Sequence, residues 1–473
     1  MTVAIWWIRR DLRVHDNQAL HQALGSAECV LPLFVFDPQL LASPTRSERR
    51  VHFLLRALHN LDSELRRRGS RLFVRFGDPR DVIPSVVREC QARIVVAEAD
   101  YTPYARKRDE AVARLVPLVL TSGLTIHPPG SVLSGTGQPY TVYSQFARAW
   151  WTLRQPAVTD LHPAPARLPL CSLVSSEPLP EPPNSPPDQF PPSEAQARRR
   201  LEQFLQTRLV SYSEGRNRLD GSGSSQLSPY FRFGLISVRE AWCLALPYLD
   251  HPETANGARA WLNELVWREF YQHLLAAFPE SVQLSMRTTF RAQEWPGSLA
   301  DFDAWREGST GFPVIDAAMR QLNAEGWISN RARMIVANFL TKLLLNDWRH
   351  GERHFRRQLL DGDLAANVGG WQWSAGTGTD AAPYFRIFNP VRQGELFDPD
   401  GNWIRRWVPE LQGVPQQYLY APWQMPSSVQ QAAGCIIGRH YPAPIVDYGR
   451  ARQRALEWFQ RRSRDDYSQV QEF

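Results

Sequence analysis

The first 130 residues alternate short apolar runs with segments of helical periodicity. The apolar runs occupy residues 3–8, 30–36, 71–76 and 94–97, with a less clear run at 124–127. Between them, residues 51–68 and 81–91 repeat apolar positions at the spacing of an amphipathic helix. This alternation predicts an α/β fold with a doubly wound parallel sheet.

Polar residues follow three of the predicted strands. Arg9 and Arg10 come after the first run, Asp37 after the second and Asp100 after the fourth. Ligands of doubly wound sheets bind at the carboxyl ends of the strands, so these four residues are candidates for a binding site. No G-x-G-x-x-G follows the first run, which argues against a dinucleotide-binding Rossmann domain.

The pattern changes after residue 130. Residues 156–192 contain twelve of the 37 prolines, which predicts a partly extended linker. From residue 194 helical periodicity dominates, and thirteen of the seventeen tryptophans lie at or beyond residue 242. We therefore predict an α/β domain at 1–130, a linker at 131–193 and an all-α domain at 194–473.

Composition limits the class of protein. With 473 residues, 43% of them hydrophobic and 22% charged, the chain is long enough for several domains and is not intrinsically disordered. The net charge of +6 mildly favours a polyanionic partner, and residues 331–360 hold seven arginines or lysines against two acidic residues. A solvated helix face explains that local excess equally well.

The cysteines and the N-terminal sequence indicate the cellular compartment of the protein. The five cysteines are scattered, and none forms C-x-x-C, so we expect neither a disulfide framework nor a metal site. A cytoplasmic protein is the simplest expectation. Neither a signal-peptide apolar region nor a run of about 18 apolar residues occurs, so we expect no membrane span.

Residues 361–373 contain the highest concentration of side chains that could have a functional role. This stretch holds two carboxylates (Asp361 and Asp363), the amide of Asn367 and two tryptophans (Trp371 and Trp373). Carboxylates and an amide can hold the polar edge of a cofactor, and an indole can stack on a base, fill a core or pass an electron. We interpret the stretch as a functional site.

A loop and two helices carry further candidates. Residues 221–230 are rich in serine and glycine before a predicted helix, which suits phosphate binding or a plain capped loop. In the predicted helix 261–271, Glu264, Trp267 and Tyr271 share a face. A flipped pyrimidine would suit that face, although a buried aromatic stripe with Glu264 paired to Arg268 is the commoner arrangement.

The predicted helix 327–334 places Asn330 and Met334 on one face. Arg331 points elsewhere and could hold a DNA phosphate, while Arg333 could pair with Asp361 or Asp363. Taken alone, Met334 could equally be a residue that fills the hydrophobic core.

Together these segments resemble the DNA photolyase and cryptochrome family, in particular the class I photolyases that repair cyclobutane pyrimidine dimers. The resemblance covers nearly the whole chain. It is carried by residues 7–13 with Asp16 and Asn17, and by residues 310–320, 361–373 and 380–390. It implies an α/β antenna domain, a long linker and a helical domain that holds FAD.

The resemblance also assigns roles by position. Asn367 would lie at flavin N5, and Arg333 would pair with Asp361 beside the flavin. The FAD-binding residues would be Tyr212, Ser224, Ser225, Gln226, Leu227, Ser228, Arg333, Asp361, Gly362, Asp363 and Asn367. Trp371, Trp348 and Trp295 would pass electrons between flavin and surface. The lesion and DNA would be bound by Arg216, Glu264, Trp267, Arg268, Tyr271, Asn330, Arg331, Met334, Trp373 and Arg386.

The implied reaction is light-driven: excited reduced FAD passes an electron to a flipped-out dimer, the ring splits and the electron returns, with Glu264 stabilising the charged dimer. The partner would be dimer-containing DNA, bound by a monomer without a metal. Arg9, Arg10, Asp37 and Asp100 resemble members whose antenna is a deazaflavin or FMN rather than folate. Two positions depart from the family pattern: Val368 where many relatives have a second asparagine, and Ser224 where threonine is common.

Three alternatives remain. A cryptochrome-like photoreceptor would bind FAD without repairing DNA. A photolyase for the six-four photoproduct would be expected to need a histidine pair, which residues 330–334 do not supply. A flavoprotein oxidoreductase would need a pyridine-nucleotide site, for which no fingerprint is found.

Overall fold

The computed structural model describes residues 2–171, 174–183, 189–383 and 385–470. The chain divides into two compact units. Unit 1 comprises residues 1–213, 225–279 and 360–365, and unit 2 comprises residues 214–224, 280–359 and 366–473. The predicted linker, 131–193, lies in unit 1, and its residues 172–173 and 184–188 are outside the described residues.

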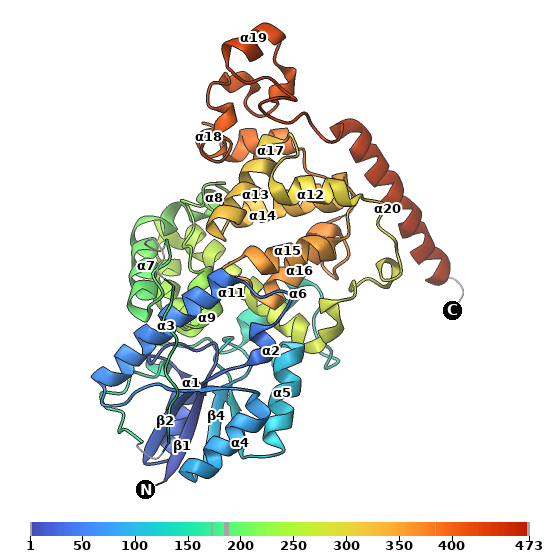
Figure 1. Cartoon of the computed structure of the whole chain (residues 1–473). Helices are drawn as coiled ribbons and strands as arrows, with labels where there is room; N and C mark the ends of the chain where they lie inside the picture. Colours follow the sequence, from blue (N-terminus) through green and yellow to red (C-terminus); the bar gives the residue numbers. More distant parts are fainter. Residues whose placement is uncertain (1, 172–173, 184–188, 384, 471–473) are drawn as a thin grey trace. The chain divides into compact units, whose positions relative to one another are not determined.

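Unit 1 is built on a five-stranded parallel sheet of order β3-β2-β1-β4-β5. The strands are β1 (Val3–Ile8), β2 (Cys29–Phe36), β3 (Phe73–Phe76), β4 (Ile94–Glu98) and β5 (Leu118–Thr121). In Figure 1, β1, β2 and β4 lie side by side at the blue end of the chain. β1 and β2 are buried along their whole length, which explains their uninterrupted apolar sequences. The predicted fold class is confirmed.

The last strand was predicted in the wrong place. β5 is an edge strand in which Val119 and Leu120 are exposed, whereas the apolar run at 124–127 is not a strand. The backbone N–H groups of Ile126 and His127 donate to the buried carboxylate of Glu269 at 2.7 and 2.8 Å. This run is apolar because it packs against a helix, a role that periodicity does not separate from a strand.

Helices complete unit 1. They are α1 (Gln18–Ser26), α2 (Pro38–Leu41), α3 (Glu48–Arg67), α4 (Pro79–Cys90), α5 (Pro103–Ala113), α6 (Tyr143–Thr152), α7 (Glu194–Thr207), α9 (Ser228–Phe233), α10 (Val238–Ala245) and α11 (Pro252–Ala277). α1 packs on β1, β4 and β5, and α4 packs on α5. The short helix α8 (Tyr212–Gly215) crosses the boundary between the units.

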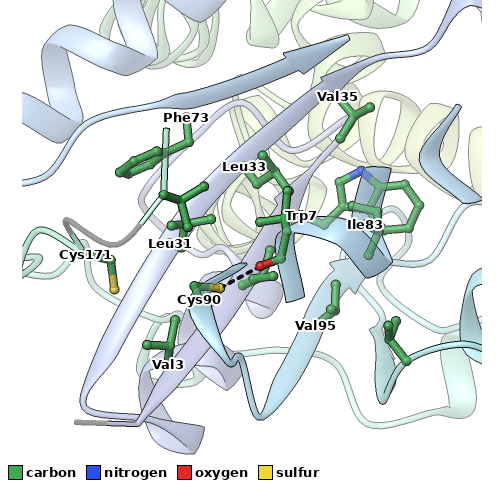
Figure 2. Close-up of a cluster of buried hydrophobic side chains, with 14 of the residues drawn as sticks. Val3, Trp7, Leu31, Leu33, Val35, Phe73, Ile83, Cys90, Val95 and Cys171 are labelled. Carbon is green, nitrogen blue, oxygen red and sulfur yellow. Dashed lines mark hydrogen bonds between the residues drawn. The ribbon is translucent and has the colours of Figure 1, made fainter. Parts of the chain in front are cut away.

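The core beneath the sheet is apolar and closely packed. Figure 2 shows Trp7, Leu31, Leu33 and Phe73 among its buried side chains, with the thiol of Cys90 donating to the carbonyl of Val86 at 3.0 Å. Burial of side chains this large is the main favourable contribution to folding.

Two cysteines of this core are bonded. The structure joins Cys29 to Cys171 in a disulfide, with Cα atoms 6.1 Å apart, while Cys90, Cys243 and Cys435 are free and buried. The sequence predicts no disulfide framework, and this single bond between Cys29 and Cys171 was not foreseen. Their separation of 142 residues leaves no local spacing by which the sequence could reveal the pair.

Unit 2 is helical in its described part. Its helices are α12 (Leu299–Glu307), α13 (Pro313–Glu325), α14 (Asn330–Asn338), the π-helix Phe339–Leu343, α15 (Trp348–Gln358), α16 (Leu364–Ala375), α17 (Pro390–Phe397), α18 (Asn402–Trp407), α19 (Ser427–Ala432) and α20 (Tyr448–Val470). α16 starts at the last two residues of unit 1. In Figure 1, α12, α13 and α14 form a yellow group, and α13 contacts both neighbours.

The π-helix carries a buried lysine. Lys342 is completely buried, and its Nζ lies 3.6 Å from the ring centroid of Phe459 with no hydrogen-bond partner among the described residues. Burial, with a contribution from the charge of Arg287, lowers the pKa of Lys342 to about 7. A buried charge without a hydrogen bond or an opposite charge beside it destabilises the folded state.

Replacing Lys342 with methionine should therefore stabilise the protein. Below pH 7 both the folded and unfolded wild type carry the proton, and the folded state bears the full cost of burying it. As pH rises from about 7 towards 10.5 the unfolded chain keeps the proton and the folded one loses it, so wild-type stability rises. Urea unfolding at about pH 6 and about pH 9 should show Lys342→Met more stable by about 1–3 kcal/mol at the lower pH, and by less at the higher.

The exposed Lys107, the chain's other lysine, gives a matched control. Lys107→Met should leave the pH dependence of the unfolding free energy unchanged. A Lys342→Met variant that is less stable than wild type at both pH values would show that Lys342 is stabilised by a partner.

Candidate functional site

Residues 361–363 are held inside unit 1 by side chains from three distant parts of the chain. The carboxylate of Asp363 accepts from Arg10 at 2.5 Å and from Gln272 Nε2 at 3.0 Å. The carbonyl oxygen of Gly362 accepts from Arg232 Nε at 3.0 Å. Asp361 is buried. The backbone of this turn is thereby fixed just before α16 begins.

Two backbone segments, at Gly223 in the serine-rich loop and at Gly215 before it, lie very close together. In unit 2, a side chain at Gly223 would overlap the backbone of Gly215, and Ser224 Oγ donates to the carbonyl of Gly221 at 2.9 Å. Only glycine allows this approach. The loop is therefore folded back on the end of α8 rather than extended.

The unit 1 part of the loop is polar but well packed. The buried Ser225 Oγ accepts from Trp261 Nε1 at 3.2 Å, which leaves its own O–H proton available to an acceptor. Gln226 Oε1 accepts a hydrogen bond from Arg200 at 2.8 Å. Leu227 is buried, and Ser228, the first residue of α9, is exposed.

The buried Tyr212 begins α8, packed edge-on against Phe204 with ring centroids 5.5 Å apart. The approach of this segment to α11 depends on Gly257, where a side chain would overlap the carbonyl of Leu209. Gly257 thus positions Tyr212 through the backbone.

Asn367 is oriented by a glutamate. Its Nδ2 donates to the backbone carbonyl of Glu352 at 3.1 Å and to Glu352 Oε1 at 3.0 Å. Glu352 is 2% exposed and also pairs with Arg356 at 2.8 Å. Burial raises the pKa of the Glu352 carboxyl. Because the NH₂ group is engaged in both bonds, the Oδ1 of Asn367 is left to accept a hydrogen bond elsewhere.

Trp371 is fixed by helix α15. It is 2% exposed, and its ring lies 5.0 Å from Phe355 and 5.9 Å from Trp305. A side chain at Gly351 would overlap the indole. Trp348, Gly351 and Phe355 are spaced i, i+3 and i+7, so Trp348 lies on the face of α15 that meets Trp371.

The chain segments that carry Trp295 and Trp348 are joined by a backbone hydrogen bond. Gly297 donates its N–H to the carbonyl of Leu345 at 2.9 Å, three residues before Trp348. Trp348 is fully buried with Nε1 donating to Ser285 Oγ at 3.3 Å. Trp295 is only partly buried and packs on Trp458 with centroids 4.8 Å apart. Among the described residues, no ring contact joins Trp295, Trp348 and Trp371 directly.

Helix α11 presents Glu264 and Trp267 one turn apart. Trp267 is half-buried and stacks flat on Tyr143, with ring centroids 3.5 Å apart and an interplanar angle of 8°. The hydroxyl of Tyr143 donates to the carbonyl of Asn263 at 3.1 Å, which locks the stack to the helix. Tyr271 lies beside Trp267 at 5.7 Å.

The side chain of Arg268 contacts other residues of unit 1. It donates to the carbonyl of Leu124 at 2.7 Å and lies over the ring of Phe231. The alternative in which it pairs with Glu264 finds no support in these contacts. Burial lowers the pKa of Arg268.

The unit 2 candidates for DNA contact differ in exposure. Asn330 is exposed and Met334 half-buried, with Asn330 Nδ2 3.9 Å from the sulfur of Met334. Arg331 stacks over Phe397 at 4.4 Å and donates to Asn217 at 2.5 Å, with Arg216 close enough to lower its pKa after the larger effect of burial. The remaining two are the half-buried Trp373 and the exposed Arg386.

Each of the four residues at the strand ends has a partner within unit 1. Arg9 binds both oxygens of Asp109, and Asp37 accepts from the hydroxyl of Tyr104. Arg10 contacts Asp100 at 3.4 Å in addition to Asp363.

Sequence reasoning missed two residues that orient the candidates. Glu352 stands four residues before Arg356 and so resembled one half of an ordinary helical ion pair. Tyr143 lies more than a hundred residues from Trp267, and no sequence pattern connects them. In the sequence, only the aromatic character of residues 139–151 singles out that segment.

Two protein-family models match separate parts of the chain. Residues 4–168 match the model of the DNA photolyase family, and residues 261–461 match the FAD binding domain of DNA photolyase. The chain belongs to the DNA photolyase family. It acts in DNA repair as a lyase and uses FAD. Val368, which follows Asn367, is buried in this photolyase.

Individual relatives agree with the family match. The deoxyribodipyrimidine photo-lyase of Escherichia coli is 40% identical over 474 residues, covering 96% of this chain and 98% of the relative. A class III photolyase from Agrobacterium tumefaciens has a TM-score of 0.90, with 36% identity and 98% of both chains covered. A Synechocystis cryptochrome has a TM-score of 0.89 at 27% identity, covering 96% of this chain and 98% of the other.

The donor set suits FAD. The proton of the Ser225 hydroxyl is available for a phosphate oxygen, and the Asn367 carbonyl oxygen is available for a ring N–H. The close approach of Gly223 to Gly215 makes the loop between them compact. Among the described residues, no three His, Cys, Asp or Glu side chains are grouped to hold a metal ion. No described helix is both long and apolar enough to cross a membrane.

Proposed function

We propose that this photolyase repairs cyclobutane pyrimidine dimers in DNA under light. The observation that carries the proposal is the face of α11 on which a carboxylate, Glu264, stands one turn from a half-exposed indole, Trp267. The stacked Tyr143 holds that indole flat. A flat, rigid aromatic surface beside a hydrogen-bonding group suits a flipped-out pyrimidine dimer, whose bases must be both stacked and held by their polar edges.

Reduced FAD, when bound and excited by light, supplies the electron that splits the cyclobutane ring and receives it back. No net oxidation or reduction results. Glu264 is proposed to hydrogen-bond the dimer while it carries the extra charge. Asn330 and Met334 on α14, and Trp373 on α16, are proposed to complete the lesion-binding surface.

Asn367 is proposed to accept the hydrogen bond from flavin N5. Glu352 fixes the amide so that its oxygen, not its NH₂ group, is presented. An oxygen acceptor favours a flavin that keeps a proton at N5. The Asp361–Arg333 pair beside the flavin stays a proposal resting on family resemblance.

DNA affinity is proposed to come mainly from phosphate contacts by Arg216, Arg331 and Arg386. Such contacts make binding salt-dependent. Arg331 is held by Phe397 and Asn217, so its guanidinium has little conformational freedom to lose on binding. We also propose that the protein acts in the cytoplasm, where DNA is accessible to it, and as a monomer.

A deazaflavin or FMN antenna at the carboxyl ends of β1, β2 and β4 is also proposed. Arg9, Asp37 and Asp100 already have partners there, so a chromophore would exchange these hydrogen bonds for its own. An absorption spectrum of the purified protein, compared with that of free FAD, tests for a second chromophore directly.

Light dependence tests the proposed reaction. Purified protein with reduced FAD should convert dimer-containing DNA to intact DNA under blue or near-ultraviolet light, and not in the dark. Loss of dimers can be followed by the return of pyrimidine absorbance. Equal repair in the dark, or none in light, contradicts the proposal.

The second candidate is a cryptochrome-like photoreceptor, favoured by the structural likeness to the Synechocystis cryptochrome. It predicts light-driven flavin reduction without dimer loss. The same experiment, with flavin absorbance and dimer content recorded together, therefore separates the two functions.

A further inference from the structure

Arg10 lies where the order of the parallel sheet reverses. It follows β1, whose neighbours are β2 on one side and β4 on the other, and the chain runs outward in both directions from there. Doubly wound sheets open a crevice at this switch point. Asp100 follows β4 at the same end of the sheet, and it contacts Arg10 at 3.4 Å.

The guanidinium of Arg10 spans from this switch point to the turn before α16. Nη1 faces Asp100 and Nη2 is 2.5 Å from Asp363 Oδ2. The other oxygen of Asp363 accepts from Gln272 on α11. Both carboxylate oxygens of Asp363 are thus bound by protein groups, which makes this side chain an anchor for the turn.

A second arginine reinforces the anchor. Arg232 donates to the carbonyl of Gly362 at 3.0 Å, while its own carbonyl accepts from Arg10 Nε at 3.4 Å. A side chain at Gly234 would overlap the backbone of Arg10 and Asp11, so glycine there permits the contact between the end of α9 and the end of β1. Two adjacent residues, Gly362 and Asp363, are held by this set.

The ion pairs of this set are shielded from water. The side chains of Arg10, Asp100 and Asp363 are 14%, 16% and 11% exposed. Burial lowers the pKa of Arg232 to about 9, with a further contribution from the charge of Arg10. A shielded ion pair is costly to break because its remaining partner is left buried and unpaired.

We propose that Arg10 is a positioning residue for the flavin: it clamps the Gly362–Asp363 turn in the conformation that binds FAD. The proposal rests on the proposed role of this turn in holding FAD. It assigns Arg10 a function distinct from the antenna contact expected from its position at a strand end.

The test measures FAD binding rather than repair. Flavin-free protein is titrated with FAD, and binding is followed by flavin fluorescence. Arg10→Gln should raise the FAD dissociation constant at least about tenfold. Arg10→Lys, which keeps the charge, should recover part of the lost affinity, whereas equal losses in the Gln and Lys variants contradict a charge-based clamp.

Arg198→Gln is the matched control. Arg198 also bridges two carboxylates from different helices, Glu194 and Glu240, but contacts neither Gly362 nor Asp363. It should lower the thermal stability of the flavin-free protein without changing FAD affinity. If Arg198→Gln weakens FAD binding as much as Arg10→Gln, general destabilisation explains the effect and the clamp is refuted.

Two further measurements keep the proposal testable if Arg10→Gln folds poorly. Gln272→Met removes only the hydrogen bond from an uncharged donor to Asp363 and should raise the dissociation constant by a smaller factor; unchanged affinity contradicts the clamp. The double variant Arg10→Gln/Asp363→Asn should lose less than the sum of the single losses, and additive losses contradict direct coupling. Wild-type protein that binds no FAD would instead refute the proposed function itself.

Discussion

Replacing Trp371 with phenylalanine should slow light-driven reduction of bound oxidised FAD by about a hundredfold or more, equivalent to roughly 3 kcal/mol of barrier. Phenylalanine fills most of the indole's volume but is far harder to oxidise, so it cannot take part in electron transfer. The packing against Phe355 and beside Gly351 favours retention of the fold, because the smaller ring meets no new obstacle. The measurement is the rate of flavin bleaching under blue light with an external reductant.

Two controls separate electron transfer from damage to the fold. Trp371→Phe with chemically reduced FAD should repair dimers nearly as well as wild type, since the relay is needed only to reduce the flavin. Trp403→Phe changes another buried tryptophan of unit 2, hydrogen-bonded to Gln321 and outside the proposed relay, and should reduce FAD at the wild-type rate. Normal photoreduction in Trp371→Phe would remove Trp371 from the relay.

Replacing Trp267 with alanine should weaken binding of dimer-containing DNA by about 1–3 kcal/mol, roughly 5- to 150-fold. The stack on Tyr143 and the hydrogen bond from Tyr143 to Asn263 hold the indole plane in place before the lesion arrives. Preorganisation of this kind means that little conformational entropy is lost on binding, so removal of the ring costs nearly its full stacking energy. Equilibrium binding to a labelled duplex with one dimer measures the effect.

The comparison with undamaged DNA identifies the source of the loss. Affinity for an undamaged duplex should be unchanged, because phosphate contacts supply it. Trp267→Phe keeps a ring that can stack on both Tyr143 and the lesion, and it should recover most of the affinity. An equal loss for damaged and undamaged DNA would mean that Trp267 supports the DNA surface in general and does not contact the dimer.

Much of the architecture follows from local pattern. Burial on both faces of β1 and β2 requires uninterrupted apolar residues, and this is why the sequence predicts a parallel sheet there. The helical region after residue 194 is equally visible, since its apolar positions repeat at the helical period. The strand misplaced at 124–127 shows the limit of such reasoning: the backbone of that run is bound to Glu269 on α11, a contact that periodicity does not reveal.

The candidate site was predictable only as a set of residue types. Residues 361–373 combine carboxylates, an amide and indoles too densely for an ordinary core segment, and the order of the motifs along the chain points to the photolyase family. The orientation of the Asn367 amide could not be predicted, because Glu352 on another helix fixes it.

The sequence alone therefore establishes the fold class, the family and the residues with suitable chemistry, because these depend on periodicity and on motifs within a few turns of chain. Tertiary structure decides how those residues are held: Trp267 on Tyr143, Asp363 on Arg10, and Cys29 bonded to Cys171. The physical reason is the sequence separation of each pair. Contacts between residues more than a hundred positions apart leave no periodic trace in a single sequence, and only the packing of the folded chain brings them together.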